Sequence, residues 1–145
     1  MEIKIASEEK EIYEILSICK EDFYNQKLNT EESIQFLANK FYKNARVVYA
    51  TENEKVQGFI AYYSNDTETK VGFVSMIIVK SNLQGMGVGT ELLQYAEDDC
   101  RNKGMNCIRL EVAVENKKAR EFYRKKAFFE TMLKNNESIY LEKII

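Results

Sequence analysis

The sequence predicts an α/β or α+β fold in which a central mixed sheet of about seven strands is flanked by four helices. The apolar runs and helical patterns follow the order β-α-α-β-β-β-α-β-α-β-β. A chain of 145 residues is long enough to bury one core, and 45% hydrophobic with 30% charged residues is typical of a soluble globular protein. We therefore expect a single domain spanning residues 1–145.

The first half of the chain predicts one strand, two helices and a meander. A short strand at residues 2–6 is followed by two amphipathic helices, which we expect Ser7 and Thr30 to cap. Three apolar runs rich in β-branched and aromatic residues then follow, separated by polar turns. These runs predict an antiparallel meander over residues 46–51, 56–64 and 71–79.

The second half predicts two helices and three strands. A helix from about Gly87 to Lys103 should end at Gly104, with Glu97 and Arg101 as an outward ion pair. The strand at residues 107–114 alternates, so its apolar set should face the core. We expect Asn116 to cap a final helix. Residues 128–133 and 138–144 then predict a closing hairpin.

The most informative motif is Gln84-Gly85-Met86-Gly87-Val88-Gly89-Thr90, which joins an apolar strand to an amphipathic helix. Glycine lets the backbone turn tightly and approach a ligand, and the first N–H groups of a helix have no partner within it. Such a loop favours an anion above the helix N-terminus. The motif therefore predicts a phosphate-binding cradle.

The glycine register separates the known kinds of phosphate loop. A dinucleotide fingerprint would need a third glycine at position 90, which is Thr90. A nucleoside triphosphate loop needs a lysine, and none lies between Lys80 and Lys103. The pattern that remains is Gln84-x-x-Gly87-x-Gly89.

This pattern resembles the pyrophosphate loop of the GCN5-related N-acetyltransferases, which holds coenzyme A. Downstream, Leu110-Glu111-Val112 followed by Asn116, Ala119, Phe122-Tyr123 and Phe128 resembles the second half of that family's signature. With the element order, the resemblance covers nearly the whole chain. Two positions depart from the family's pattern: Ser81 stands where proline is frequent, and Ala127 where glycine is frequent.

The resemblance implies acetyl-coenzyme A as co-substrate and a set of residues that bind it. The backbone of Ile77, Ile78 and Val79 would pair with the pantetheine arm. Gln84 would brace the loop or touch a phosphate. Asn116 would touch the cofactor near the thioester, or serve only as a helix cap. The pyrophosphate would be held by the backbone N–H groups of Gly85, Met86, Gly87, Val88, Gly89 and Thr90.

The implied chemistry is direct attack of an acceptor amine on the thioester. Tyr123 stands where the family often places the acid that protonates the departing sulfur, and its alternative role is a core aromatic. Glu111 is the candidate base that takes a proton from the amine. Its alternative role is a structural ion pair with Arg109 on the same strand face.

The acceptor is expected to be a primary amine on a small molecule, an amino sugar or a peptide. The first two helices and their connection would bind it, with Phe23, Tyr24, Asn25 and Gln26 as candidate contacts, although core packing explains Phe23 equally well. The alternative function is a non-catalytic acyl-coenzyme A sensor or interaction module of the same fold.

Composition excludes several other classes. The chain has no histidine and three cysteines without CxxC spacing, so we expect no metal site and no disulfides. No signal peptide or long apolar segment is apparent, which favours a cytoplasmic protein without membrane contact. An edge strand near the C-terminus makes a homodimer plausible.

Charge is uneven along the chain. Residues 1–100 carry 10 basic and 17 acidic side chains and residues 101–145 carry 11 and 6, so the two parts have net charges of −7 and +5. With an overall charge of −2 and no recognised module, nucleic-acid binding is not expected. A cluster of basic side chains either attracts the phosphates of the cofactor or forms a solvated helix face. Its members are Lys117, Lys118, Arg120, Arg124, Lys125 and Lys126.

Overall fold

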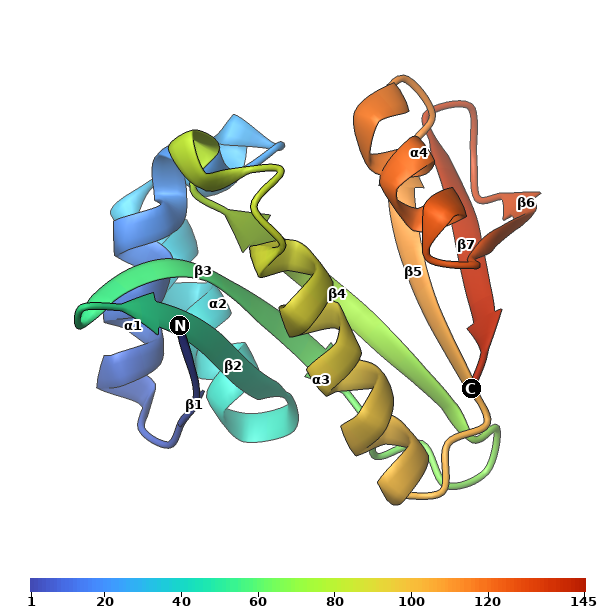
Figure 1. The fold of residues 1–145 in the computed structure, drawn as a ribbon, viewed down its shortest axis with the longest axis horizontal. Coiled ribbons are helices and arrows are strands. Elements are labelled where there is room, and N and C mark those ends of the chain that lie inside the picture. The colour runs from blue at the N-terminus through green and yellow to red at the C-terminus, as the bar shows by residue number, and fades with distance from the viewer. The chain divides into compact units, whose positions relative to one another are not determined.

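The computed structural model describes residues 1–145 and contains seven strands in one mixed sheet of order β1-β2-β3-β4-β5-β7-β6 (Figure 1). This confirms the predicted fold class and element order. The strands are β1 (Glu2–Ala6), β2 (Arg46–Glu52), β3 (Lys55–Tyr63), β4 (Val71–Val79), β5 (Cys107–Ala113), β6 (Phe129–Leu133) and β7 (Ser138–Ile144). The α-helices are α1 (Glu9–Cys19), α2 (Glu31–Asn44), α3 (Val88–Asn102) and α4 (Lys117–Lys125). Three 3-10 helices are η1 (Lys20–Asp22), η2 (Gln26–Leu28) and η3 (Ser81–Leu83).

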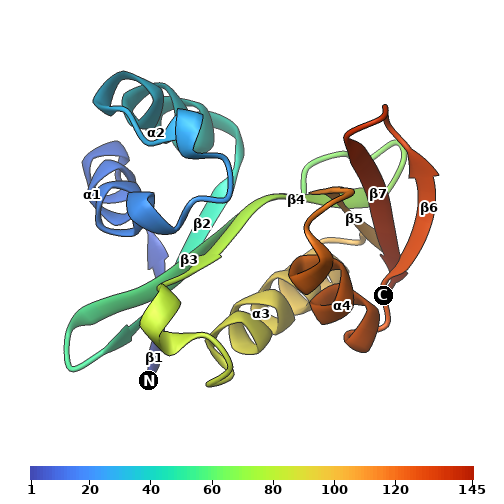
Figure 2. The same ribbon diagram turned by 90° about the horizontal axis from the view of Figure 1, so that it is seen from above.

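The first of two compact units comprises Met1–Tyr63 and Met76–Ala96. In it β1 pairs antiparallel with β2, and β2 pairs antiparallel with β3. Helices α1 and α2 lie side by side on one face of these strands, and the first half of α3 lies on the opposite face (Figure 2). The core between α1, α2 and the sheet is apolar, since the spacing of the apolar residues gives each helix one inward stripe.

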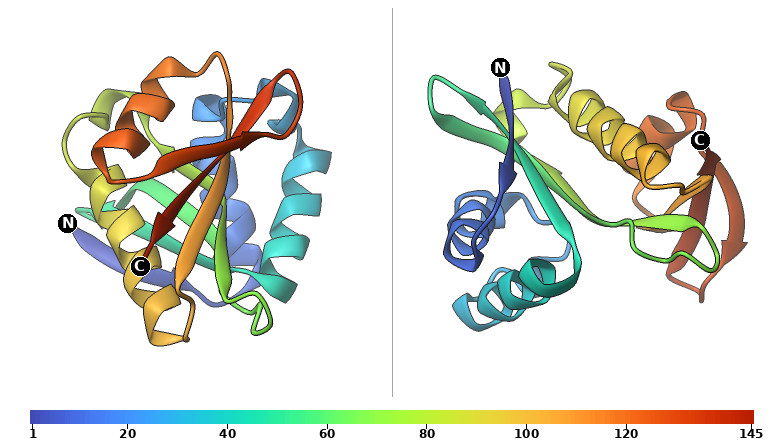
Figure 3. Two further views of the ribbon diagram at one scale, coloured as in Figure 1. Left: turned by 90° about the vertical axis from the view of Figure 1, so that its right-hand side faces the viewer. Right: turned by 90° about the horizontal axis from the view of Figure 1, so that it is seen from below.

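The second unit comprises Ser64–Ser75 and Glu97–Ile145. The first residues of β4 pair parallel with β5, β5 pairs antiparallel with β7, and β7 forms the closing hairpin with β6 (Figure 3). Helix α4 packs on the face that carries Leu110 and Leu141, which are directly opposite each other and 2% and 1% exposed. The alternation of β5 therefore places Glu111 on the other face.

Three of the predicted helix ends are confirmed. The Thr30 hydroxyl accepts a hydrogen bond from the Ser33 N–H at 3.1 Å, and Asn116 Oδ1 accepts one from the Ala119 N–H at 3.2 Å. Gly104 follows α3 with φ +88°, the left-handed conformation that ends a helix.

The predicted Ser7 cap is wrong. Glu8 occupies the N-cap position of α1 and makes no side-chain capping bond. The Ser7 N–H instead donates to Glu11 Oε1 at 2.9 Å. A carboxylate on the first turn therefore satisfies the backbone just before the helix, as in the second half of a capping box.

The predicted outward pair of Glu97 and Arg101 is also wrong. The Glu97 side chain is 4% exposed and its Oε1 lies 2.6 Å from Lys143 Nζ on β7. Arg101 pairs with Asp98 at 3.0 Å. Helical spacing made Glu97 and Arg101 neighbours, but packing of α3 against the sheet turned Glu97 inward, where a buried carboxylate needs a cation.

The three cysteines are free and buried, as predicted. Burial raises the pKa of the Cys19, Cys100 and Cys107 thiols to about 11 each. Thiols of this kind are unreactive near neutral pH. No helix in the structure combines the length and the apolar character needed to span a membrane.

Candidate active site

The glycine loop between η3 and α3 has the conformation that its sequence predicted. Gly85 and Gly87 have φ of +84° and +87°. No other atom lies within 4 Å of the place where a Cβ would stand on either residue. Glycine is therefore required here by backbone conformation, and the space above the loop is open.

The loop leads to a row of unpaired backbone donors. The Glu91 N–H donates to the Gly87 carbonyl at 3.1 Å, and this is the first intrahelical bond of α3. The N–H groups of Val88, Gly89 and Thr90 precede it and have no acceptor within the helix. The Met86 N–H is occupied, because it donates to the Leu83 carbonyl at 3.3 Å. The Met86 N–H was predicted to bind pyrophosphate, but in the structure it stabilises the turn of the loop.

Gln84 connects this loop to the end of β4. Its Nε2 donates to the Val79 carbonyl at 3.3 Å. The side chain thereby holds the start of the loop against the strand from which it leaves. Bracing of the loop was one of the two roles considered for Gln84 from the sequence, the other being contact with a phosphate.

The C-terminal half of β4 extends beyond its ladder with β5. That ladder contains four residue pairs, from Val71–Cys107 to Val74–Leu110. Ile77, Ile78 and Val79 therefore have no β5 partner in register. The Val79 carbonyl accepts the Gln84 bond, and the other backbone groups on that side are left for another partner.

Sequence reasoning missed Gly58, which shapes the same end of β4. A Cβ on Gly58 would lie 2.5 Å from the Ile78 carbonyl oxygen and 3.1 Å from the Val79 Cα. Only glycine allows β3 to approach β4 this closely. The available signal was an isolated glycine inside an apolar strand pattern, which often marks close backbone approach.

In the second unit, Asn116 and Tyr123 lie on α4. Asn116 Oδ1 is the helix cap, so a ligand would meet the amide nitrogen of this side chain. Tyr123 is 5% exposed and packs edge-to-face against Phe122 and Phe128, with ring centroids 5.2 and 5.4 Å away. Burial raises the pKa of the Tyr123 phenol far above its ordinary value. The group is therefore a neutral hydrogen-bond donor at physiological pH.

Ala127 forms the turn between α4 and Phe128. It adopts φ +70°, the left-handed conformation that the sequence raised as a possibility for this non-glycine residue. The turn lets the Phe128 N–H donate to the Tyr123 carbonyl at 3.0 Å. Left-handed backbone costs a residue with a Cβ about 1 kcal/mol.

Glu111 forms an ion pair, but not with the expected partner. Lys134 Nζ donates to Glu111 Oε1 at 3.1 Å. Arg109 instead pairs with Glu142 at 2.9 Å, its cross-strand neighbour on β7. Arg109 also lies over the Tyr140 ring, 5.4 Å from its centroid. The Arg109–Glu111 pair considered from the sequence is therefore wrong.

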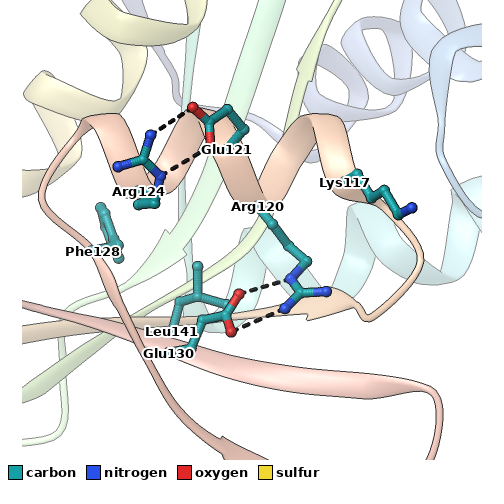
Figure 4. Close-up of a pocket in the computed structure, with 7 residues that line it drawn as sticks. All are labelled: Lys117, Arg120, Glu121, Arg124, Phe128, Glu130 and Leu141. Atoms are coloured by element: carbon teal, nitrogen blue, oxygen red, sulfur yellow. Dashed lines mark hydrogen bonds and ion pairs between the residues drawn. The ribbon is translucent and has the colours of Figure 1, made fainter.

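The basic row of α4 lines a hollow of about 460 Å³ (Figure 4). Phe128 and Leu141 also line it, and two carboxylates neutralise two of its cations. Arg120 bonds both oxygens of Glu130 at 2.7 and 3.0 Å, and Arg124 bonds both oxygens of Glu121 at 2.9 and 2.7 Å. None of the residues predicted for catalysis, the glycine cradle or the acceptor lines this hollow.

The candidate acceptor contacts differ in exposure. Phe23 is 3% exposed and packs edge-to-face against Phe59 at 6.5 Å, so it belongs to the core of the first unit. Tyr24 is 57% exposed. Asn25 and Gln26 are bonded to nearby backbone, Asn25 as the cap of η2 and Gln26 to the Phe23 carbonyl. Tyr24 is thus the aromatic side chain of this segment that remains available to a ligand.

The known proteins that this chain resembles are acetyltransferases. The model of the acetyltransferase (GNAT) family matches residues 9–128. An uncharacterised N-acetyltransferase of Methanocaldococcus jannaschii is 35% identical over 82 residues, which are 54% of this chain and 36% of that protein. N-alpha-acetyltransferase 30 of Schizosaccharomyces pombe is 33% identical over 57 residues, 39% of this chain and 38% of that protein. The matched segments span little more than a third of either relative.

A solved structure shares the fold over the whole chain. It is the PaiA N-acetyltransferase of Thermoplasma acidophilum in complex with coenzyme A, with a TM-score of 0.79 and 18% identity. The alignment covers 100% of both chains.

Proposed function

This chain belongs to the acetyltransferase (GNAT) family, and we propose that it transfers an acetyl group from acetyl-coenzyme A to a primary amine. The observation that carries the proposal is the row of free N–H groups at Val88, Gly89 and Thr90 behind two left-handed glycines. A helix N-terminus of this kind binds phosphate through backbone dipoles alone.

The residues of the first unit fit the donor. In the proposal, the N–H groups of Gly85, Gly87 and the first turn of α3 hold the pyrophosphate. The unpaired edge of Ile77, Ile78 and Val79 binds the amide-rich pantetheine arm, as an added strand would. Gln84 keeps the loop and this edge together, and Asn116 adds an amide contact from α4.

Two side chains of the second unit accept and donate the protons that the reaction moves. Acetyl-coenzyme A supplies an activated acyl group, and the amine must lose a proton while the departing sulfur gains one. Glu111 accepts the proton of the amine, directly or through water, and Tyr123 donates its phenolic proton toward the sulfur.

The acceptor in this proposal is a small amine, an amino sugar or a peptide amine, and Tyr24 is its candidate aromatic contact. The similarity to N-alpha-acetyltransferase 30 adds weight to a peptide N-terminus. A probe panel should therefore include a short peptide with a free N-terminus, an aminoglycoside-type amino sugar and a polyamine.

The second candidate function is an acyl-coenzyme A sensor without turnover, which the cradle alone would also allow. Two measurements separate the candidates: thermal stabilisation by acetyl-coenzyme A, and release of free thiol with the amine panel. The enzyme requires both responses. Stabilisation with no thiol release on any amine supports the sensor, and the absence of any stabilisation contradicts the donor-binding proposal itself.

A further inference from the structure

Lys134 presents a primary amine to Glu111, the proposed base. Lys134 Nζ lies 3.1 Å from Glu111 Oε1, within hydrogen-bonding distance. This is the relation that an acceptor amine must have to a base that takes its proton. The lysine and the base belong to the same unit of the same chain.

The surroundings leave Lys134 free to move. It follows β6 in the hairpin turn, where its N–H donates to the Ser138 carbonyl at 2.9 Å. Its side chain is 46% exposed and that of Glu111 is 31% exposed. An exposed ion pair of this kind is weak and breaks easily. The backbone is thus fixed while four methylene groups give the ammonium its reach.

Other lysine ion pairs in the structure lack this combination. Lys143 pairs with Glu97, but the two side chains are only 23% and 4% exposed. Lys103 pairs with Asp99 at 3.4 Å within α3, and Lys125 with Glu121 at 3.9 Å within α4. None of these carboxylates is part of the proposed catalytic pair, so none of these lysines is placed to use it.

We propose that Lys134 is a self-acetylation site, modified by the chain's own acetyltransferase activity. The proposal rests on the proposed function and names an acceptor that the chain carries within itself. Because Glu111 hydrogen-bonds the lysine, no external ligand is required to bring amine and base together.

The step balances as follows. Glu111 takes one proton from the Lys134 ammonium, and the free amine attacks the thioester carbonyl of acetyl-coenzyme A. The carbon–sulfur bond breaks as the carbon–nitrogen bond forms, and the sulfur leaves with the proton donated by Tyr123. The nitrogen loses its second proton to solvent water, from which the Tyr123 phenolate regains its own. The products are Nε-acetyl-lysine at position 134 and free coenzyme A, and no oxidant or reductant is needed.

Acetylation would then change the site itself. It removes the positive charge of Lys134, so the ion pair with Glu111 ends. The modified chain presents an unpaired Glu111 carboxylate to a second, external amine.

The chemistry of the ion pair makes the test selective. The Glu111 carboxylate raises the pKa of Lys134, so less of its amine is unprotonated at neutral pH. Uncatalysed acetylation needs the free amine and is therefore disfavoured at Lys134. Lys117 is exposed and forms no ion pair, which makes it the internal reference for uncatalysed labelling.

The experiment incubates the full chain with deuterium-labelled acetyl-coenzyme A and no added amine, and follows each lysine by peptide mass spectrometry. We expect Lys134 to be labelled at least about tenfold faster than Lys117, since a positioned base contributes factors of this size or more. A tenfold dilution of the protein should leave the rate constant unchanged. Equal labelling of Lys134 and Lys117, or a rate that falls with dilution, would overturn the proposal.

Two variants complete the design. Glu111→Gln should reduce labelling of Lys134 to the Lys117 level, and Lys134→Arg keeps the charge while removing the acceptor. Thermal melting of each variant checks the fold. Thiol release with the amine panel runs in parallel: turnover on a panel amine without label at Lys134 rejects self-acetylation alone, whereas absence of both rejects the proposed function.

Discussion

The Cβ that Gly58 lacks would stand 2.5 Å from the carbonyl oxygen of Ile78. Real Cβ atoms do not approach a carbonyl oxygen this closely, so any other residue at position 58 must push β4 away. Ile78 belongs to the strand end proposed to bind pantetheine. A residue on β3 thereby fixes the geometry of a ligand site that it does not line.

Gly58→Ala should therefore weaken both stability and donor binding. Overpacking of this kind costs about 1–3 kcal/mol, and displacement of β4 should raise the Kd for acetyl-coenzyme A. Chemical denaturation and calorimetric titration measure the two effects. Lys55→Ala on the same strand is the control, and a Gly58→Ala variant with unchanged affinity would separate Gly58 from the site.

Gly87→Ala tests the cradle against a matched control. Gly87 and Gly104 have φ of +87° and +88°, and neither Cβ would touch another atom. Each substitution should cost about 1 kcal/mol of stability from left-handed backbone. Only Gly87→Ala should weaken acetyl-coenzyme A binding, as measured by titration. Equal loss of affinity in both variants would show a general effect of destabilisation.

Tyr123→Phe should lower kcat and leave the KM for acetyl-coenzyme A nearly unchanged. General acid catalysis contributes about 10²–10⁴-fold, and the ring packing against Phe122 and Phe128 is preserved. Tyr63→Phe is the control: its buried hydroxyl has no hydrogen-bond partner, so its removal should leave turnover unchanged. Steady-state kinetics with the panel amine that is turned over fastest measures these effects. A kcat of the Tyr123→Phe variant equal to that of the wild type would exclude the acid role.

Stability should fall in alkaline solution. Burial raises the pKa of the three thiols from 9.0 to about 11, and burial together with the Glu11 hydrogen bond raises that of Tyr49 from 10.0 to about 12. Below the unfolded pKa both states keep the proton. Above it the unfolded state loses the proton first, so the free energy of unfolding decreases as pH rises from 9 toward 11.

Denaturant titrations at several pH values measure this slope, which is at most about 1.4 kcal/mol per pH unit for each group. Cys100→Ala should flatten the curve between pH 9 and 11. A slope identical to that of the wild type would show that Cys100 does not contribute.

The β6 edge predicts self-association. All five residues of β6 are exposed, and three are large and apolar: Phe129, Met132 and Leu133 at 50%, 62% and 61%. An edge strand of this character is a template for pairing with a second chain. Met132→Lys should shift the chain toward monomer in sedimentation experiments. A wild-type chain that is monomeric at high concentration would contradict the homodimer.

Local rules predicted most of the fold from the sequence. Asn116, Thr30 and Gly104 act within a few residues of their own position, so their roles follow from short-range hydrogen bonding and backbone conformation. The glycine register in residues 84–90 was informative for the same reason. Even the left-handed turn at Ala127 could be anticipated from the helix that it ends.

Side-chain partners were predicted less well, because they depend on tertiary packing. Glu97 pairs with Lys143, 46 positions away, rather than with Arg101 one turn along the helix. Glu111 pairs with Lys134 across the β7 strand, and Arg109 with Glu142. In each case several cations were available, and strand register and burial determined which one came within reach.

The proposed pyrophosphate cradle consists of main-chain N–H donors, so truncating a side chain does not remove any of them. Alanine substitutions at Met86, Val88 and Thr90 should therefore leave the affinity for acetyl-coenzyme A almost unchanged, although this segment holds the pyrophosphate. The donors also carry no titratable group, so pyrophosphate recognition should vary little with pH. Replacing the Gly89 amide by an ester through semisynthesis removes its N–H donor and would test this part of the site directly.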